Sequence, residues 1–347
     1  MTKNEKYWQA RTAQRMWEHM QSAEETADQV AKVYAKASLY LSREIQDIFK
    51  KYVEKHHLTE KEALQLLNTL RDRTSIEELR QRLQSSSQKQ EIADLLAELE
   101  APAYQARIQR LQELQTQIDL VMQQVYKQEQ AITTAHYIQL AEEAYNRSIF
   151  DIQQRTGFGF SFSHIDQKQV DKVLKSKWSG MNYSERVWRN TRAVAQEVKE
   201  ALLVNLITGR TERETAEMLT KKFAGGSSKA RRLIRTESCY LSNQLEMESY
   251  KECGIDKYQY LATLDLRTSE ICRELDGKVF LVKDQQPGKN CPPMHPWCRS
   301  TTIAIIGEKM LEGMKRRARD PVTGKTYLVP ASMNYSCLLY TSDAADD

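Results

Sequence analysis

Four side chains in the C-terminal part of the chain could bind a transition metal: Cys272, Cys291, His295 and Cys298. Their spacing is Cys-x18-Cys-x3-His-x2-Cys, and structural zinc takes four thiolate or imidazole ligands in a tetrahedron. Cys291, His295 and Cys298 are close enough in sequence to share one ion. Cys272 would have to reach that ion from the other side of a turn. The pattern therefore predicts a structural zinc site.

Two other interpretations of these residues stay open. Cysteine also packs as a small buried apolar side chain, in which case His295 is an ordinary turn residue. A catalytic Cys–His pair would need a third group to orient the histidine, and the sequence offers no clear one. Nor does it offer paired carboxylates, a Ser-His-Asp arrangement or the His-x-Glu of zinc deaminases. We therefore expect that the protein is not an enzyme.

The stretch around these residues predicts a short antiparallel sheet that would position them. The apolar residues 258–264 lead into the stretch and the β-branched run 301–306 leads out of it, and both have the composition of strands. Asp276-Gly277 indicates a turn between them, and Pro292-Pro293 stiffens the loop. A loop of this length rarely keeps its shape without a cross-link, which a zinc ion would supply.

The stretch 261–306 resembles the phage minor head protein family, the Mu F-like head morphogenesis proteins. The family signature combines an Asp-x-Arg-Thr element, a Leu-Asp-Gly turn and a Pro-Pro-x-His-Pro-x-Cys-Arg element. The matching positions are Asp265, Arg267, Thr268, Cys272, Leu275, Asp276, Gly277, Phe280, Pro292, Pro293, His295, Pro296, Cys298 and Arg299. Many members carry further cysteines at two positions where this chain has Ser269 and Ser300.

This resemblance implies a structural minor head protein of a tailed phage or prophage. Such a protein acts with the portal protein and other head proteins in procapsid assembly, and it can contact packaged double-stranded DNA without sequence preference. It would be found in the virion and, during assembly, in the cytoplasm of the host bacterium. The alternatives are a zinc-dependent, nuclease-like enzyme and a toxin-carrier protein that uses the same domain.

The composition agrees with a protein that works away from membranes. The 347 residues carry a formal net charge of only +4, which does not by itself indicate a nucleic-acid-binding protein. No apolar run reaches the roughly 18 residues of a membrane span, so we expect no membrane partner. Six cysteines in a chain of this length favour a reducing compartment over a secreted disulfide framework.

Glycine and proline are distributed unevenly, which predicts the domain organisation. Residues 1–156 contain no glycine and only one proline, Pro102, whereas all twelve glycines follow. Because helices avoid both residues, we expect a mainly α protein. An elongated helical bundle would span 1–156, and a smaller α+β domain with a short antiparallel sheet would span 157–330. The tail 331–347 is expected to be truncated, and its last eleven residues, from Cys337, do not resemble native protein.

Apolar residues at three- and four-residue steps predict the individual helices. The longest run covers about 4–56, another begins at Pro102 and reaches about residue 150, and a third covers 183–207. Capping boxes at Thr59 and Ser75 predict two short helices between the first two.

The segment 210–235 is basic and is the candidate nucleic-acid contact. A glycine–serine loop over 225–228 is expected to separate two helices, so that free N–H groups of the second helix could face a phosphate. The candidate DNA-binding residues are Lys229, Arg231, Arg232 and Arg235. The alternative is a solvated helix face with a few ion pairs. DNA binding through such residues would be weak, non-specific and salt-sensitive.

Overall fold

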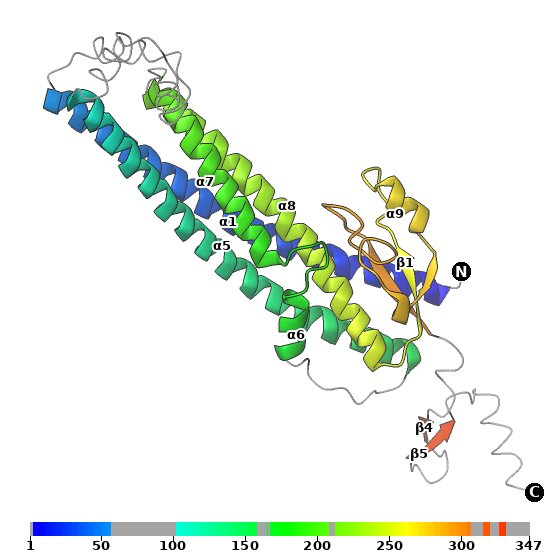
Figure 1. The fold of residues 1–347 in the computed structure, drawn as a ribbon. Helices are drawn as coiled ribbons and strands as arrows, with labels where there is room; N and C mark the ends of the chain where they lie inside the picture. Colours follow the sequence, from blue (N-terminus) through cyan, green and yellow to red (C-terminus); the bar gives the residue numbers. More distant parts are fainter. Residues whose placement is uncertain are drawn as a thin grey trace, which may run out of the picture. The chain divides into compact units, whose positions relative to one another are not determined.

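The computed structural model describes residues 3–56, 102–157, 165, 167–207, 212–306, 315–319 and 326–330. Within them the protein is mainly α-helical with a small antiparallel sheet near its C-terminal end, which confirms the predicted fold class (Figure 1). Several predictions fall outside this part of the chain: the helices at Thr59 and Ser75, the hairpin after Gly157, Arg210 and the tail 331–347.

The bounds of the described helices are α1 Lys3–His56, α5 Pro102–Thr156, α6 Gln167–Leu174, α7 Tyr183–Ile207, α8 Glu212–Glu252 and α9 Glu270–Leu275. Helices α1, α5 and α7 begin and end close to the predicted positions. Pro102 is the first residue of α5, where its missing N–H costs no hydrogen bond. Gly157 follows the same helix with φ of 71°, a left-handed conformation that glycine adopts without strain.

The sheet has the strand order β2-β1-β3, and both pairings are antiparallel. Its strands are β1 Lys257–Leu261, β2 Val279–Leu281 and β3 Thr301–Ile305, with a 3-10 turn η1 over Val282–Asp284. In the register, Tyr258 of β1 lies opposite Phe280 and Ala304. Two further strands, β4 Lys315–Arg319 and β5 Thr326–Pro330, pair with each other. The two predicted strands correspond to β1 and β3, which flank the segment with the predicted metal ligands.

The chain divides into two compact units. Unit 1 contains residues 1–25, 134–183 and 232–347, and unit 2 contains residues 26–133 and 184–231. Each unit thus draws on both sides of residue 157, so this division differs from the predicted border there, which stays a prediction. Among the described residues, no helix combines the length and the apolar character that crossing a membrane requires.

The predicted glycine–serine loop at 225–228 is wrong. These residues lie inside α8, which continues through them without interruption. A Cβ atom on Gly226 would come within 2.6 Å of Val194 Cγ2 and 2.8 Å of a ring carbon of Tyr34, so this glycine permits close helix packing in unit 2. Because backbone N–H groups inside a helix bond to carbonyls of the preceding turn, they are not free for a phosphate.

Unit 1 is held by a buried ionic cluster in addition to its apolar core. The Arg15 guanidinium of α1 donates to Asp151 of α5 over 2.5 Å and to Glu246 of α8 over 2.7 Å. The hydroxyls of Thr301 and Thr302 on β3 donate to the other Glu246 oxygen. Side chains of three helices and one strand therefore meet at a single charge cluster.

Two buried histidines also join α1 and α5 to α8 in unit 1. His19 Nδ1 lies 2.8 Å from the Ser242 hydroxyl, and His136 Nε2 lies 2.9 Å from the Ser238 hydroxyl. Burial lowers the pKa of His19 to about 3, with nearby Arg15 adding to the effect. Burial likewise lowers the pKa of His136 to about 4. Both imidazoles are therefore neutral in the folded protein at neutral pH.

These histidines predict a loss of stability in mild acid. Their pKa values are lower in the folded than in the unfolded state, so stability is complete above about pH 6.5 and is lost as the pH falls toward 4. Between pH 6.5 and 5 each histidine can remove up to about 2 kcal/mol from the free energy of unfolding. The double variant His19→Asn/His136→Gln should lose less stability over this range in urea titrations. Equal losses in both proteins would contradict the assignment.

Candidate metal centre

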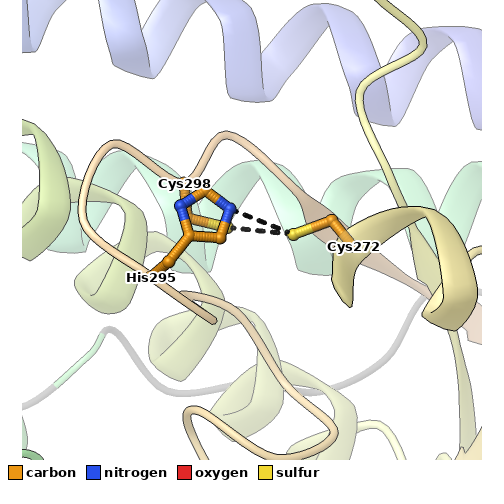
Figure 2. A group of neighbouring side chains, drawn as sticks. All are labelled: Cys272, His295 and Cys298. Atoms are coloured by element: carbon orange, nitrogen blue, oxygen red, sulfur yellow. Dashed lines mark hydrogen bonds between the residues drawn. The ribbon is translucent and has the colours of Figure 1, made fainter. Parts of the chain in front are cut away.

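Three of the four predicted ligands come together in unit 1. Cys272 Sγ lies 3.4 Å from His295 Nε2 and 3.8 Å from Cys298 Sγ, and all three ligand atoms lie within 4.8 Å of one another. In Figure 2 the His295 ring and the Cys272 sulfur point toward each other from the loop and from α9. A tetrahedral zinc ion with bonds of about 2.3 Å to sulfur and 2.0–2.1 Å to nitrogen sets S–S edges of about 3.8 Å and S–N edges of about 3.6 Å. The observed spacings match both edges.

His295 is oriented as a metal ligand. Its Nδ1 lies 2.7 Å from the carbonyl oxygen of Pro296. A carbonyl only accepts hydrogen bonds, so Nδ1 must carry the hydrogen, and the lone pair of the neutral ring is then on Nε2, which faces the thiols. A hydrogen bond from the other ring nitrogen to a backbone carbonyl is the usual second contact of a metal-binding histidine.

The loop that presents His295 and Cys298 has an unusual backbone. The Pro292-Pro293 peptide bond is cis, and Trp297 has φ of 68°, a left-handed conformation that is rare for bulky residues. The Trp297 N–H donates to the Thr236 hydroxyl of α8, and the Arg235 guanidinium lies 5.5 Å from the centre of its ring. Contacts with α8 thus hold the conformation that brings His295 and Cys298 to the same place.

The two cysteines of the group lie in a network of hydrogen bonds to sulfur. The Tyr260 hydroxyl donates to Cys272 Sγ over 3.2 Å. The hydrogen bond between the two thiols, together with burial, raises the pKa of Cys272 to about 12. A hydrogen bond with the Cys239 thiol is the largest cause that raises the pKa of Cys298, to about 11. Without a metal ion both residues are therefore thiols at neutral pH, and a bound cation would displace their protons.

The metal group is accessible from one side. His295 is partly exposed at the wall of a groove of about 1090 Å³, which is also lined by Trp17, Leu264 and Trp297. Cys272 and Cys298 are each only 1% exposed. An ion can therefore enter past the imidazole, and the sulfurs behind it are shielded from water.

Cys291, the fourth predicted ligand, is not part of this group. Its side chain is fully buried in the larger apolar cluster of unit 1, which also contains Tyr258 and Ala304. Burial raises the pKa of its thiol to about 12. The prediction relied on its four-residue distance from His295 in sequence, but Cys291 packs in the larger apolar cluster whereas His295 faces Cys272.

Most residues of the family motif tie the loops of this region together. Asp265 accepts two hydrogen bonds from the Arg299 guanidinium, at 2.5 and 2.9 Å, and further bonds from the Arg267 N–H and the Thr268 hydroxyl. The bond from Arg299 is the main cause that lowers the pKa of Asp265. This ion pair, the Asp265–Arg299 clamp, joins the loop after β1 to the residue directly after Cys298.

Asp276 and Gly277 close the turn on the other side of the group. The Asp276 carboxylate accepts a hydrogen bond from the Ala262 N–H over 2.8 Å, just beyond the end of β1. Gly277 has φ of 76° and donates its N–H to the Tyr260 carbonyl over 2.9 Å. Pro293 takes part in the cis bond. The motif thus specifies the framework around the metal group.

The predicted DNA-binding residues are mostly engaged in ion pairs. In unit 2, Lys229 lies 3.0 Å from Glu197, and Arg231 pairs with Asp28. In unit 1, Arg235 pairs with Glu24. Arg232 is exposed and makes no ion pair with another residue in the described part of the chain. This arrangement favours the alternative of a solvated helix face, and DNA binding stays a prediction.

Part of the chain resembles a known protein family. Residues 196–303 match the family model described as Phage Mu protein F like protein. This segment, 108 of the 347 residues, is similar to the members of that family. It includes the whole metal group and the Asp265–Arg299 clamp, and it confirms the resemblance seen in the sequence. The match supports a phage head protein.

The chain is also similar to NAD(+)--arginine ADP-ribosyltransferase EFV of Enterococcus faecalis. The two are 23% identical over 256 residues, which are 70% of this chain and 51% of that protein. The chain therefore spans about half the length of this curated relative. No solved structure matches the chain at a significant level.

Sequence reasoning missed Tyr260 and Cys239, which both contact the cysteines of the group. A signal for Tyr260 was present, because the alternating residues Tyr258 and Tyr260 are the fully buried side of β1. Cys239 lies 33 residues before Cys272 in sequence, in a helix whose pattern suggested only packing.

The Asp265–Arg299 clamp predicts how the loop responds to substitution. Asp265→Asn removes the carboxylate that accepts the paired bonds from Arg299, so amide hydrogens of residues 262–269 should exchange faster with solvent. Hydrogen exchange followed by mass spectrometry measures this effect. Glu217→Gln, which breaks the exposed Arg213–Glu217 pair of α8, is the matched control and should leave exchange in this segment unchanged. Unchanged exchange in Asp265→Asn would contradict the clamp.

Proposed function

We propose that this protein is a structural minor head protein of a tailed phage or prophage. It acts with the portal protein and other head proteins in procapsid assembly, and it is part of the virion. The family match over residues 196–303 is the observation that carries this proposal. Assembly would take place in the cytoplasm of the host bacterium.

The proposed role needs no catalysis, and the described site supports this view. The motif residues Asp265, Arg267 and Thr268 bond to each other or to the neighbouring loop, and so they act as framework. We propose that the Cys272–His295–Cys298 group binds zinc as a structural ion. A zinc ion in such a site would stabilise the fold, because the folded chain holds the ligands together and the unfolded chain does not. The protein is then not an enzyme.

We propose that DNA, if it is a partner, is bound with low affinity. To bind a phosphate, Lys229 and Arg231 would have to leave Glu197 and Asp28, and this competition lowers the affinity. Contact with packaged double-stranded DNA is therefore proposed as non-specific and dominated by charge. High DNA concentration inside a head would compensate for a weak intrinsic affinity.

A toxin carrier is the second candidate function. It is supported by the similarity to an ADP-ribosyltransferase of which only about half, 51%, is matched. In that case the described region would carry an activity that resides elsewhere in a longer protein. An assay for transfer of ADP-ribose from NAD+ to arginine, made on the protein as encoded in its genome, distinguishes this candidate from a head protein.

The head-protein proposal predicts that purified phage heads contain this chain in few copies. Heads from a host that carries the phage or prophage would be analysed by quantitative mass spectrometry, with the portal protein as internal reference. Deletion of the gene should lower the yield of infectious particles, and the wild-type gene supplied from a plasmid should restore it. Absence from purified heads, together with normal yield after deletion, would contradict the proposal.

The DNA proposal predicts opposite effects for two charge changes, one on α7 and one on α8. Glu197 pairs with both Lys222 and Lys229, so Glu197→Gln should release two cations and strengthen DNA binding. The variant Lys229→Gln/Arg231→Gln/Arg232→Gln should weaken it equally for all sequences and reduce the slope of log affinity against log salt by up to about 2.7. Fluorescence anisotropy with two unrelated duplexes measures both. Salt-independent affinity would exclude this mode of binding.

A further inference from the structure

A fourth cysteine lies against the metal group. Cys239 of α8 is fully buried, in the same cluster as Cys272 and Cys298. Cys239 is near enough to Cys298 to raise the pKa of the Cys298 thiol. Its sulfur is also 3.6 Å from the carbonyl oxygen of Ser300, two residues further along the loop. Among the described cysteines, Cys253 and Cys291 instead lie in the other apolar cluster of unit 1.

We propose that Cys239 is the fourth ligand of a Cys3His zinc site, together with Cys272, His295 and Cys298. This inference rests on the zinc part of the proposed function. Three thiolates and one imidazole form one of the standard ligand sets of structural zinc. Cys239 is the cysteine of α8 and lies in the same buried cluster as Cys272 and Cys298. Its sulfur is not among the three ligand atoms that lie within 4.8 Å of one another, so its side chain has to move closer to the group when the ion binds.

The surrounding hydrogen bonds suit a thiolate at Cys239. At present its S–H donates to the Ser300 carbonyl. When zinc binds, each of the three thiols releases its proton to solvent, so this donor is lost. The Ser300 carbonyl remains satisfied, because Asn243 Nδ2 also donates to it over 3.3 Å. The same amide lies 3.7 Å from Cys239 Sγ, where its N–H stabilises a thiolate.

The charges around the group also suit three thiolates. Three thiolates and one Zn²⁺ leave a net charge of −1 in a buried place. Arg299 directly follows Cys298 and supplies a cation beside the group, where it also pairs with Asp265. The Tyr260 hydroxyl donates to Cys272 and neutralises part of the remaining charge.

The site would connect three segments of the chain. Cys239 belongs to α8, Cys272 to α9, and His295 and Cys298 to the loop before β3. A zinc ion would therefore fix the loop to the helix, in addition to the apolar contacts of this cluster. With four protein ligands no coordination position is left for water or substrate, which is the property of a structural rather than a catalytic site.

The test uses the full chain purified without chelator and three single variants. Zinc content per chain is measured by elemental analysis, and zinc affinity by competition with a chromophoric chelator.

Wild type should contain about one zinc per chain. Cys239→Ser should bind zinc more than about 100-fold more weakly, since even the loss of a group that only orients a ligand can cost that much. Cys272→Ser is the positive control. Cys291→Ser, which changes an equally buried cysteine outside the group, should keep wild-type affinity.

A second measurement counts the thiolate ligands directly, and its alkylation part uses wild type alone. With Co²⁺ in place of zinc, a tetrahedral site gives intense visible bands, and Cys239→Ser should reduce the thiolate charge-transfer absorption by about one third, from three thiolates to two. In wild type, chelator should expose Cys239, Cys272 and Cys298 to alkylation together. If Cys239→Ser keeps wild-type affinity and absorption, the fourth-ligand inference fails while the zinc proposal stands. If wild type holds no metal, or Cys272 and Cys298 form a disulfide, both fail, and the head-protein proposal is unaffected.

Discussion

The buried guanidinium of Arg15 is the interaction on which the rest of unit 1 depends. Its side chain is only 4% exposed, and it lies between the carboxylates of Asp151 and Glu246. A charge of this kind is tolerated in the interior only when it is fully paired, and removal of one partner typically costs about 3–5 kcal/mol. Because Glu246 also accepts bonds from Thr301 and Thr302, the pairing fixes where β3 begins. The loop that carries His295 and Cys298 ends where β3 begins, so the ion cluster sets the position of this loop.

One face of α8 contacts the residues that close the metal loop. Cys239, Asn243, Glu246 and Tyr250 follow one another at steps of four, three and four residues, which places them on the same side of a helix. Each of them bonds to residues 300–302 through side chain or backbone. A helix face in the core usually carries apolar residues, and each polar group buried there must find a partner. On this face the partners are all in one short segment, which explains why polar residues are tolerated at these four positions.

The sequence predicted those features that depend on local patterns. The bounds of α1, α5 and α7, the strands β1 and β3 and the Asp276–Gly277 turn follow from periodicity, capping and backbone preference, and the structure agrees with them. What the sequence did not predict concerns contacts between distant segments. Gly226 resembles a loop residue in sequence, but it lies inside α8 and is a point of close approach for Tyr34 and Val194. Distance along the chain likewise did not indicate that Cys291 packs in the larger apolar cluster, or that Cys239 lies in the cluster of Cys272 and Cys298.

The motif of the family and the metal group are coupled through Arg299. Its guanidinium holds the Asp265 carboxylate on one side, and on the other it is close enough to Cys298 and Cys272 to interact with their charge. Binding of zinc would convert the neutral thiols to thiolates, so the site would become anionic and attract Arg299 more strongly. In turn, the clamp keeps the residue after Cys298 in place, and the ligand with it. The motif residues and the metal ligands thus stabilise the same loop by two interactions that reinforce each other, and neither requires a reacting substrate.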